Sequence, residues 1–240
     1  MKDRVAVALC LTGRRAVIWT VAAAALAMSV GGGAVVASAP ASATGPIVFD
    51  GSPGSGPPPA TLGPYSMTPF PADPQANLAL VTAVAAPGGG SVTFDATVQH
   101  RIVGTSWGGW SHGYTGDVYC TTTSACASAV ADQNNRVLTL PPNTVAFYFY
   151  AAPDHGVTAN ITATAQDGTT SGPISVSIPT AQYFGFYGTP NDPITTISIS
   201  MAAPGTGMGI GEFGIATQAP TPPTTTSTPS SIVVAPKFTG

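Results

Sequence analysis

Apolar and polar residues alternate with a period of two along much of the chain, which is the pattern of half-buried β-strands. Residues 91–103 show it most clearly, because apolar and polar side chains there fall on opposite faces. The apolar face consists of Val92, Phe94, Ala96 and Val98. In residues 144–152 aromatic and aliphatic side chains occupy both faces, which predicts a central strand that is buried on both sides.

Other segments with strand-like patterns lie between glycine, proline or Asp-Gly turn signals. These segments are residues 47–50, 77–84, 136–140, 157–166, 172–178, 181–187, 193–201 and 208–216. The spacing predicts about ten or eleven strands and no helix after the N-terminal region. Two packed antiparallel sheets accommodate such strands, so we expect an all-β, jelly-roll-like sandwich. The Gly- and Pro-rich residues 51–74 are expected to be an extended segment.

The N-terminal residues have the order of a secretory signal peptide, with basic residues first, an apolar run at residues 16–30 and small residues to Ala43. The apolar run of 15 residues is shorter than the roughly 20 that a spanning helix needs. This favours a cleaved leader, residues 1–43, over an uncleaved membrane anchor. Arg14 and Arg15 precede the run, so export is expected by the general secretory route or by the twin-arginine route.

The composition divides the rest of the chain into two parts. Residues 44–216 are expected to form one β-sandwich domain, which is long enough to bury its own core. Residues 217–240 are rich in threonine and proline, and this composition is typical of an extended, disordered tail. We therefore expect a protein that is secreted and works outside the cell.

Removal of the leader changes the charge of the protein. The cations that remain are Arg101, Arg136 and Lys237, against nine acidic residues, which gives a formal net charge of −6. Three scattered cations cannot form a basic patch, so nucleic acid is excluded as a partner and binding to anionic membranes is disfavoured. The partner class that we expect, polysaccharide or cell-envelope glycan, follows from the aromatic cluster described below and not from the charge.

Two cysteines remain after Cys10 leaves with the leader. Cys120 and Cys126 are close in sequence, and an even pair in an exported chain predicts a disulfide. The alternative is a metal site with two thiolates, but no further metal ligands lie near them in the sequence.

Three segments of the chain resemble a group of uncharacterised bacterial exported proteins. The segments are Trp110–Tyr119 (WSHGYTGDVY), Leu140–Tyr150 (LPPNTVAFYFY) and Gly211–Ala216 (GEFGIA). The likeness covers roughly residues 58–216 and is to ectodomains that often precede a sorting anchor of the PEP-CTERM type. This chain ends in its Thr/Pro tail instead of the Pro-Glu-Pro motif and anchor. The resemblance implies a β-sandwich on the cell exterior and implies no activity.

Two short motifs match enzyme or cofactor signatures without the structural context that those signatures need. Residues 104–108 match G-x-S-x-G around Ser106, but no helix is expected to follow, so we interpret them as a bend between strands. Residues 209–214 match G-x-G-x-x-G, which binds dinucleotides only between a strand and a helix. We interpret these glycines as places where strands bend or approach closely.

Glu212 is the only glutamate in the chain and lies in the last predicted strand. It is a candidate for three roles: one acid of a glycosidase pair, a ligand of a structural calcium ion, or a solvated strand residue. The pattern favours the third, so no catalytic residue, metal ligand or cofactor is assigned.

Aromatic residues and one histidine cluster among glycines in residues 107–119: Trp107, Trp110, His112, Tyr114 and Tyr119. Each ring alone is best explained by packing in the core, but together the rings are a candidate surface for stacking against sugars. The leading hypothesis is therefore a non-catalytic exported protein that binds carbohydrate. A structural or adhesive surface protein is the alternative, and a secreted hydrolase is the third.

Overall fold

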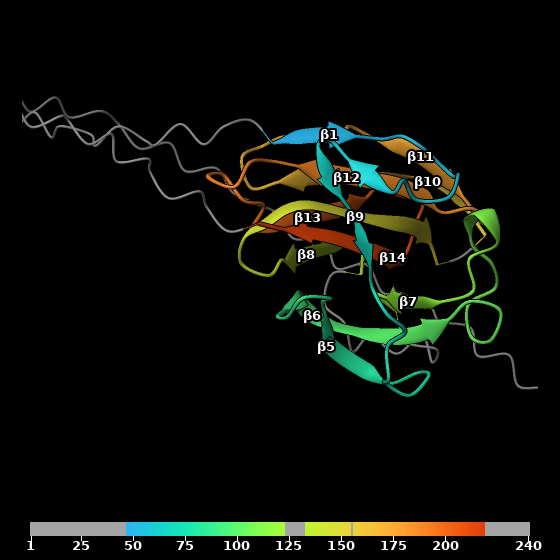
Figure 1. Ribbon diagram of the computed structural model, residues 1–240. Helices are drawn as coiled ribbons and strands as arrows, with labels where there is room; N and C mark the ends of the chain where they lie inside the picture. The colour runs from blue at the N-terminus through green and yellow to red at the C-terminus, as the bar shows by residue number, and fades with distance from the viewer. Residues whose placement is uncertain (1–46, 123–132, 155, 219–240) are drawn as a thin grey trace, which may run out of the picture. The chain divides into compact units, whose positions relative to one another are not determined.

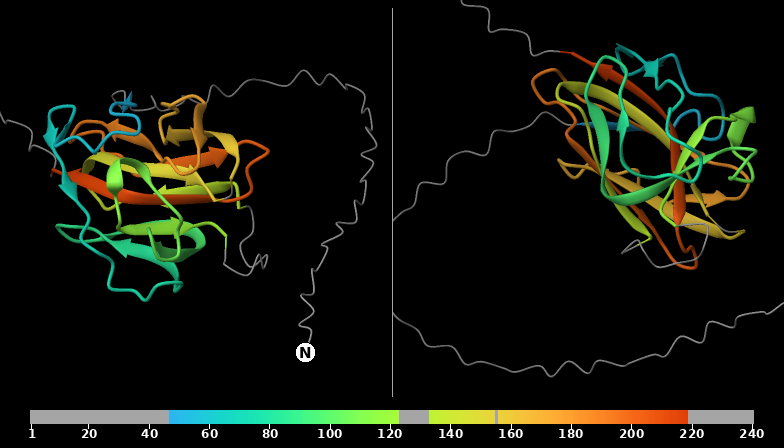
Figure 2. Two further views of the ribbon diagram at one scale, coloured as in Figure 1. Left: turned by 90° about the vertical axis from the view of Figure 1, so that its right-hand side faces the viewer. Right: turned by 90° about the horizontal axis from the view of Figure 1, so that it is seen from below.

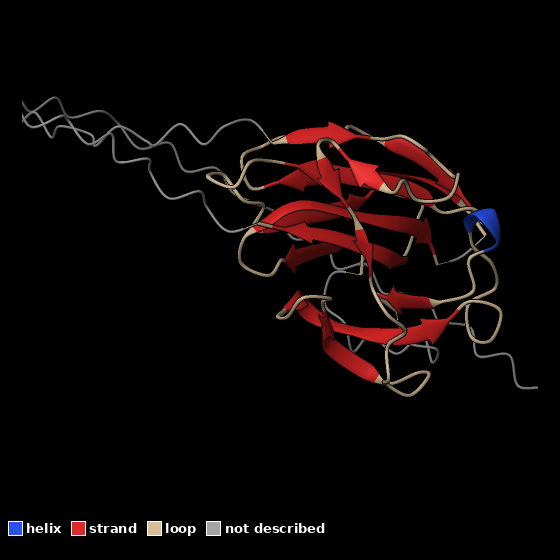
Figure 3. Cartoon of the chain, in the orientation of Figure 1, coloured by secondary structure: helices blue, strands red, loops and turns tan. Residues whose placement is uncertain are grey.

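The computed structural model describes residues 47–122, 133–154 and 156–218 of the 240-residue chain. Within these ranges the backbone forms 14 β-strands and one 3₁₀ turn, η1 (Ser111–Gly113), and no α-helix (Figures 1 and 3). The prediction of an all-β protein is therefore confirmed. No helix in this part of the chain has the length and apolar character needed to cross a membrane.

The first four strands are short and lie in or beside the Gly- and Pro-rich region: β1 (Val48–Asp50), β2 (Thr61–Leu62), β3 (Tyr65–Ser66) and β4 (Thr68–Pro69). The middle four are β5 (Leu80–Ala85), β6 (Ser91–Ile102), β7 (Asp117–Cys120) and β8 (Asn135–Thr139). The last six are β9 (Thr144–Pro153), β10 (Thr158–Ala165), β11 (Ile174–Ser177), β12 (Gln182–Tyr187), β13 (Thr196–Met201) and β14 (Met208–Thr217). Each predicted segment coincides with a strand, whereas β2, β3, β4 and β7 were not expected because Gly and Pro obscure their alternation.

Twelve of the strands form one continuous antiparallel sheet in the order β1-β12-β9-β14-β7-β6-β8-β13-β10-β11, with β4 beside β14 and β5 beside β6. The remaining two strands, β2 and β3, pair with each other. Figure 2 shows the curled sheet from two further sides. The pairing does not separate the strands into the two sheets that we expected. The long strand β6 pairs with β7 through its last four residues and with β8 through Thr93 and Phe94. It therefore joins two groups of strands, here called the two arms: β1-β12-β9-β14-β7 and β8-β13-β10-β11.

Strand β9 lies between β12 and β14 and is buried at every position, as predicted for a central strand. Phe149 stacks on Phe184 of β12, with ring centroids 5.2 Å apart, whereas Tyr148 and Tyr150 fall on the other face of the strand. Residues 53–71, here called the proline strap, contact that tyrosine face. The Tyr150 hydroxyl donates a hydrogen bond to the carbonyl of Gly56 in the strap at 2.6 Å. Figure 1 shows the strap crossing in front of β9 and β14.

Several sequence predictions lie outside the described residues. The leader (residues 1–43) is one of these, and so is nearly all of the tail, of which only residues 217 and 218 are described. Residue 217 ends β14, and the backbone N–H of Gln218 donates to the carbonyl of Asn143 at 2.9 Å. Ordered β-structure thus continues slightly beyond the predicted boundary at residue 216.

Candidate functional site

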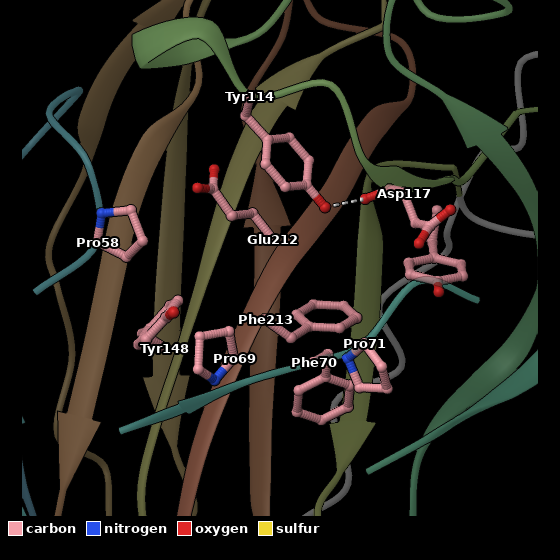
Figure 4. Close-up of a pocket in the computed structure, with 10 residues that line it drawn as sticks. Pro58, Pro69, Phe70, Pro71, Tyr114, Asp117, Tyr148, Glu212 and Phe213 are labelled. Atoms are coloured by element: carbon pink, nitrogen blue, oxygen red, sulfur yellow. Dashed lines mark hydrogen bonds between the residues drawn. The ribbon is translucent and has the colours of Figure 1, made fainter. Parts of the chain in front are cut away.

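A small cavity of about 110 Å³ lies where the proline strap meets β7, β9 and β14 (Figure 4). We call it the bulge pocket, and its walls are aromatic rings, proline rings and two carboxylates. The lining residues are Pro58, Pro69, Phe70, Pro71, Tyr114, Asp117, Tyr119, Tyr148, Glu212 and Phe213. Elements far apart in the sequence thus meet here.

The pocket lies at a gap in the pairing along one edge of β14. Strand β7 pairs with Gly209–Gly211, and β4 pairs with Gly214 and Ile215. On the opposite edge of β14 the register with β9 shifts between Gly211 and Gly214, because β14 contains one extra residue there. This β-bulge holds Glu212 at φ +52°, in the left-handed region that residues other than glycine seldom adopt. A bulge re-aims side chains, and here it directs Glu212 and Phe213 into the gap between β7 and β4.

Glu212 is almost completely buried and both of its carboxylate oxygens accept hydrogen bonds. Trp110 donates from Nε1 to Oε2 at 2.9 Å, and His112 approaches Oε1 through Nε2 at 2.6 Å. Burial raises the pKa of the Glu212 carboxyl, while the bonds from His112 and Trp110 oppose that shift. Glu212 is therefore a fixed, buried acceptor and not the solvated strand residue that the sequence pattern favoured.

Two histidines outside the lining hold the two carboxylates of the pocket in the same way. His112 lies between Glu212 and the carbonyl of Ser55, and His100 lies between Asp117 Oδ1, at 2.7 Å, and the carbonyl of Ala76, at 3.1 Å. Each carboxylate is therefore held by an imidazole ring that also contacts a backbone carbonyl of a neighbouring segment.

The tyrosine hydroxyls of the lining present mainly acceptor oxygens. Tyr114 donates its proton to the carbonyl of Asp117 at 3.2 Å, and Tyr119 donates to Asp73 Oδ2 at 2.8 Å. The Tyr148 hydroxyl makes no hydrogen bond within the described ranges, and its oxygen is not among the fully buried atoms without a partner, so it is open to the pocket. Burial raises the pKa of all three phenols, that of Tyr148 to about 12, so they stay neutral.

The structure gives different positions to the five aromatic and histidine residues singled out from the sequence. The indoles of Trp107 and Trp110 are buried, at 7% and 8% exposure, and pack edge to face, with ring centroids 6.0 Å apart. They therefore do not present a flat face for sugar stacking. Tyr114 and Tyr119 line the bulge pocket. Trp110 and His112 lie outside the lining and form hydrogen bonds with the Glu212 carboxylate, which fixes its position.

Other residues of the pocket were not found from the sequence. Asp117, Tyr148 and Phe70 lie far apart in the chain, and only the fold brings them together. One signal for Tyr148 was available, because tyrosines alternate with phenylalanines along residues 147–150 and so share the face opposite the phenylalanines.

The glycines of residues 209–214 lie within β14 and not at a strand-to-helix turn, as we interpreted. A Cβ on Gly214 would overlap the ring of its cross-strand neighbour Tyr148, and one on Gly209 would overlap the Trp107 ring. The missing side chain at Gly214 therefore allows the Tyr148 ring to lie across β14 beside the pocket.

Ser106 does not form a nucleophile elbow. Residues 104–106 form a turn, and the only helical element that follows them in the described residues is η1, three residues long. The Ser106 hydroxyl donates to the side-chain oxygen of Asn77 at 2.5 Å and accepts from the N–H of Ile102 at 3.0 Å. Its proton is thus bonded to an amide oxygen and not to a base, which agrees with the interpretation of this segment as a bend.

The predicted disulfide is not present at Cys120, which is a buried free thiol. Its sulfur lies 3.1 Å from the Thr122 hydroxyl, and burial raises the pKa of the thiol to about 12. Cys126, its predicted partner, lies outside the described residues. In the part of the chain that is described, no three His, Cys, Asp or Glu side chains gather as a metal site.

Comparison with known proteins gives no relative from which a role could be transferred. No protein-family model matches the chain, and no curated protein matches it at a significant level.

Proposed function

We propose that this protein is an exported, non-catalytic domain that binds carbohydrate through the bulge pocket. The observation that carries the proposal is the lining, in which flat rings, acceptor oxygens and no cationic side chain surround one cavity. The C–H faces of a sugar pack against aromatic and proline rings, and its hydroxyls donate to carboxylates and phenols. Ligand pockets for drug-sized molecules measure about 300–1,000 Å³. A cavity of about 110 Å³ therefore suits one terminal sugar residue and not the interior of a polysaccharide chain.

The state of the carboxylates supports binding over hydrolysis. Asp117 and Glu212 line the same pocket, as a glycosidase pair would, but protein donors already occupy all four of their oxygens. A general acid must release its proton to the substrate and a nucleophile must be free to attack. Carboxylates that are held by indole, imidazole and backbone donors instead offer their remaining lone pairs as fixed acceptors.

Within this proposal the two arms that β6 joins are the two layers of a jelly-roll-like sandwich. Contacts of β9 in one arm with β10 and β11 in the other support face-to-face packing. Export rests on the leader, and N-terminal sequencing of the protein from culture medium should begin at Thr44. A protein that retains residues 1–43 in the cytoplasm would contradict export.

A glycan array with the purified protein tests the binding function. We expect binding to a defined set of terminal sugars and a clear loss in Tyr114→Phe, which removes one hydroxyl from the pocket. Tyr187→Phe is the matched control, because Tyr187 lies on β12 and does not line the pocket. Absence of binding to every glycan would exclude carbohydrate as the ligand.

One observation favours a structural or adhesive surface protein as a second candidate. Leu78 and Leu80 are 42% and 58% exposed at the start of β5, which pairs on the described sheet with β6 only. Exposed apolar side chains beside a strand edge are a surface for association. Retention of the protein on washed cells, lost on Leu80→Lys, would favour this candidate.

A further inference from the structure

We propose that the group that enters the bulge pocket is a protonated primary amine, so that the recognised glycan ends in a sugar with a free amino group. The inference rests on the proposed carbohydrate-binding function and names the chemistry that its ligand must carry. Three properties of the lining support it: the direction of its hydrogen bonds, its charge and one unpartnered hydroxyl.

The polar side chains of the lining are almost all acceptors. The protons of Tyr114 and Tyr119 point to Asp117 O and Asp73, so their oxygens offer only lone pairs to a ligand. The carboxylates of Asp117 and Glu212 also accept only. A ligand group with donors alone satisfies such a wall best, and an ammonium group brings three N–H donors and no acceptor.

The charge of the lining favours the same group. Asp117 and Glu212 bring acidic charge, and none of the ten lining residues is Lys, Arg or His. A sugar acid would place a third carboxylate beside these two in a site that is shielded from water, which is strongly unfavourable. An ammonium group is attracted by both carboxylates and by the faces of the five aromatic rings: Phe70, Tyr114, Tyr119, Tyr148 and Phe213.

Tyr148 supplies the third and independent observation. Tyr148 lines the pocket and is only 1% exposed to solvent. Its hydroxyl has no hydrogen-bond partner among the residues that the structure describes. Its oxygen is not among the fully buried atoms that lack a partner, so it is open to the pocket and offers a further acceptor to a donor on the ligand. Gly214 keeps the ring in place for this contact.

Isothermal titration of the protein at neutral pH tests the inference with four probes. These are an oligomer of glucosamine, its fully N-acetylated counterpart, an oligogalacturonate and methylammonium alone. A charge-assisted hydrogen bond corresponds to about tenfold or more in affinity, so the glucosamine oligomer should bind at least about tenfold tighter than the acetylated one. The oligogalacturonate should not bind.

Two phenylalanine variants locate the effect. Tyr148→Phe should weaken binding of the glucosamine oligomer by about tenfold, because it removes one acceptor for the ammonium group. Tyr183→Phe should leave binding unchanged, since this buried tyrosine of β12 does not line the pocket. Circular dichroism and thermal unfolding of both variants show whether each still folds.

The possible outcomes separate this inference from the function on which it rests. Equal binding of the acetylated and free oligomers would overturn the amine inference and leave carbohydrate binding in place. Binding of methylammonium without any glycan would keep the amine site and overturn the carbohydrate function. Binding of no probe, or an equal loss in both tyrosine variants, would overturn the inference.

Discussion

Replacement of His112 by alanine tests whether the buried Glu212 carboxylate depends on its imidazole partner. The side chain of Glu212 is 8% exposed and that of His112 is 14% exposed, so their 2.6 Å contact is shielded from solvent. In His112→Ala the carboxylate keeps only the indole N–H of Trp110 as a side-chain donor. A buried charge that loses one of its partners is costly, whereas an exposed ion pair contributes little.

The structure sets the expected size of this effect. A hydrogen bond to a charged group contributes about 1.5–3 kcal/mol, so we expect His112→Ala to lower the free energy of unfolding by about 2 kcal/mol at pH 7. For a domain of 150–250 residues this corresponds to a fall in Tm of about 4–8 °C. The Glu212→Gln variant should lose less, because a neutral amide keeps an acceptor for Trp110 and needs no proton.

The pH dependence follows from the raised pKa of Glu212. Because burial holds this pKa above its ordinary value in the folded protein, the folded state binds more protons than the unfolded state above that value. Stability contributed by this group is therefore greatest below the ordinary glutamic acid range and falls as the pH rises through the folded-state pKa. Loss of His112, which opposes the shift, raises the pKa further. The loss in the free energy of unfolding that His112→Ala causes should therefore grow as the pH increases from 4 to 7.

Urea unfolding between pH 4 and pH 8 measures the effect in wild type, His112→Ala, Glu212→Gln and the double variant. In the Glu212→Gln background, His112→Ala should have less than half of its effect at pH 7, because the charged partner is gone. A deficit that is the same at every pH and in both backgrounds would refute the pairing argument and leave only lost packing around His112.

Three further predictions concern single residues of the fold. Gly214→Ala should lower the free energy of unfolding by about 1–3 kcal/mol in chemical denaturation, because the added methyl group overlaps the Tyr148 ring. The same variant should lose ligand binding. An unchanged stability would contradict the close approach of Gly214 and Tyr148. Tyr183→Phe should raise the free energy of unfolding by up to about 1 kcal/mol, because the buried Tyr183 hydroxyl has no partner in the described ranges; a clear loss of stability would reveal a bound partner. Cys120, with a pKa of about 12, should resist alkylation at pH 8 in the folded protein and react after denaturation; no reaction after denaturation would indicate a disulfide.

The alternation of side chains was sufficient to predict most of the sheet. β9 was predicted as a central strand because Phe149 and Tyr150 are both too large and apolar to face water, whichever face they occupy. The glycines at 209–214 were assigned to close approaches of strands, and the Gly214–Tyr148 pair has that role. By contrast, β7 was missed because it follows a Gly-rich loop that hides its short alternation.

The candidate site could be predicted only in part. Tyr114 and Tyr119 belonged to the aromatic cluster seen in the sequence, but Trp107 and Trp110 from the same cluster turned inward. A period-two pattern shows which side chains share a face of a strand, and it does not show whether that face is later covered by another segment. Here the proline strap covers it, and the sequence of the strap contains no periodic signal of its own.

The sequence by itself determined the all-β class and most of the strand segments, because these properties depend on local periodicity and composition. Only the tertiary structure decided that the strands form one continuous sheet through β6, that Glu212 is buried, and that a pocket opens between β7 and β4. The reason is that a pocket depends on strand neighbours and on one bulge, and pairing between distant strands leaves no mark at any single position of the chain.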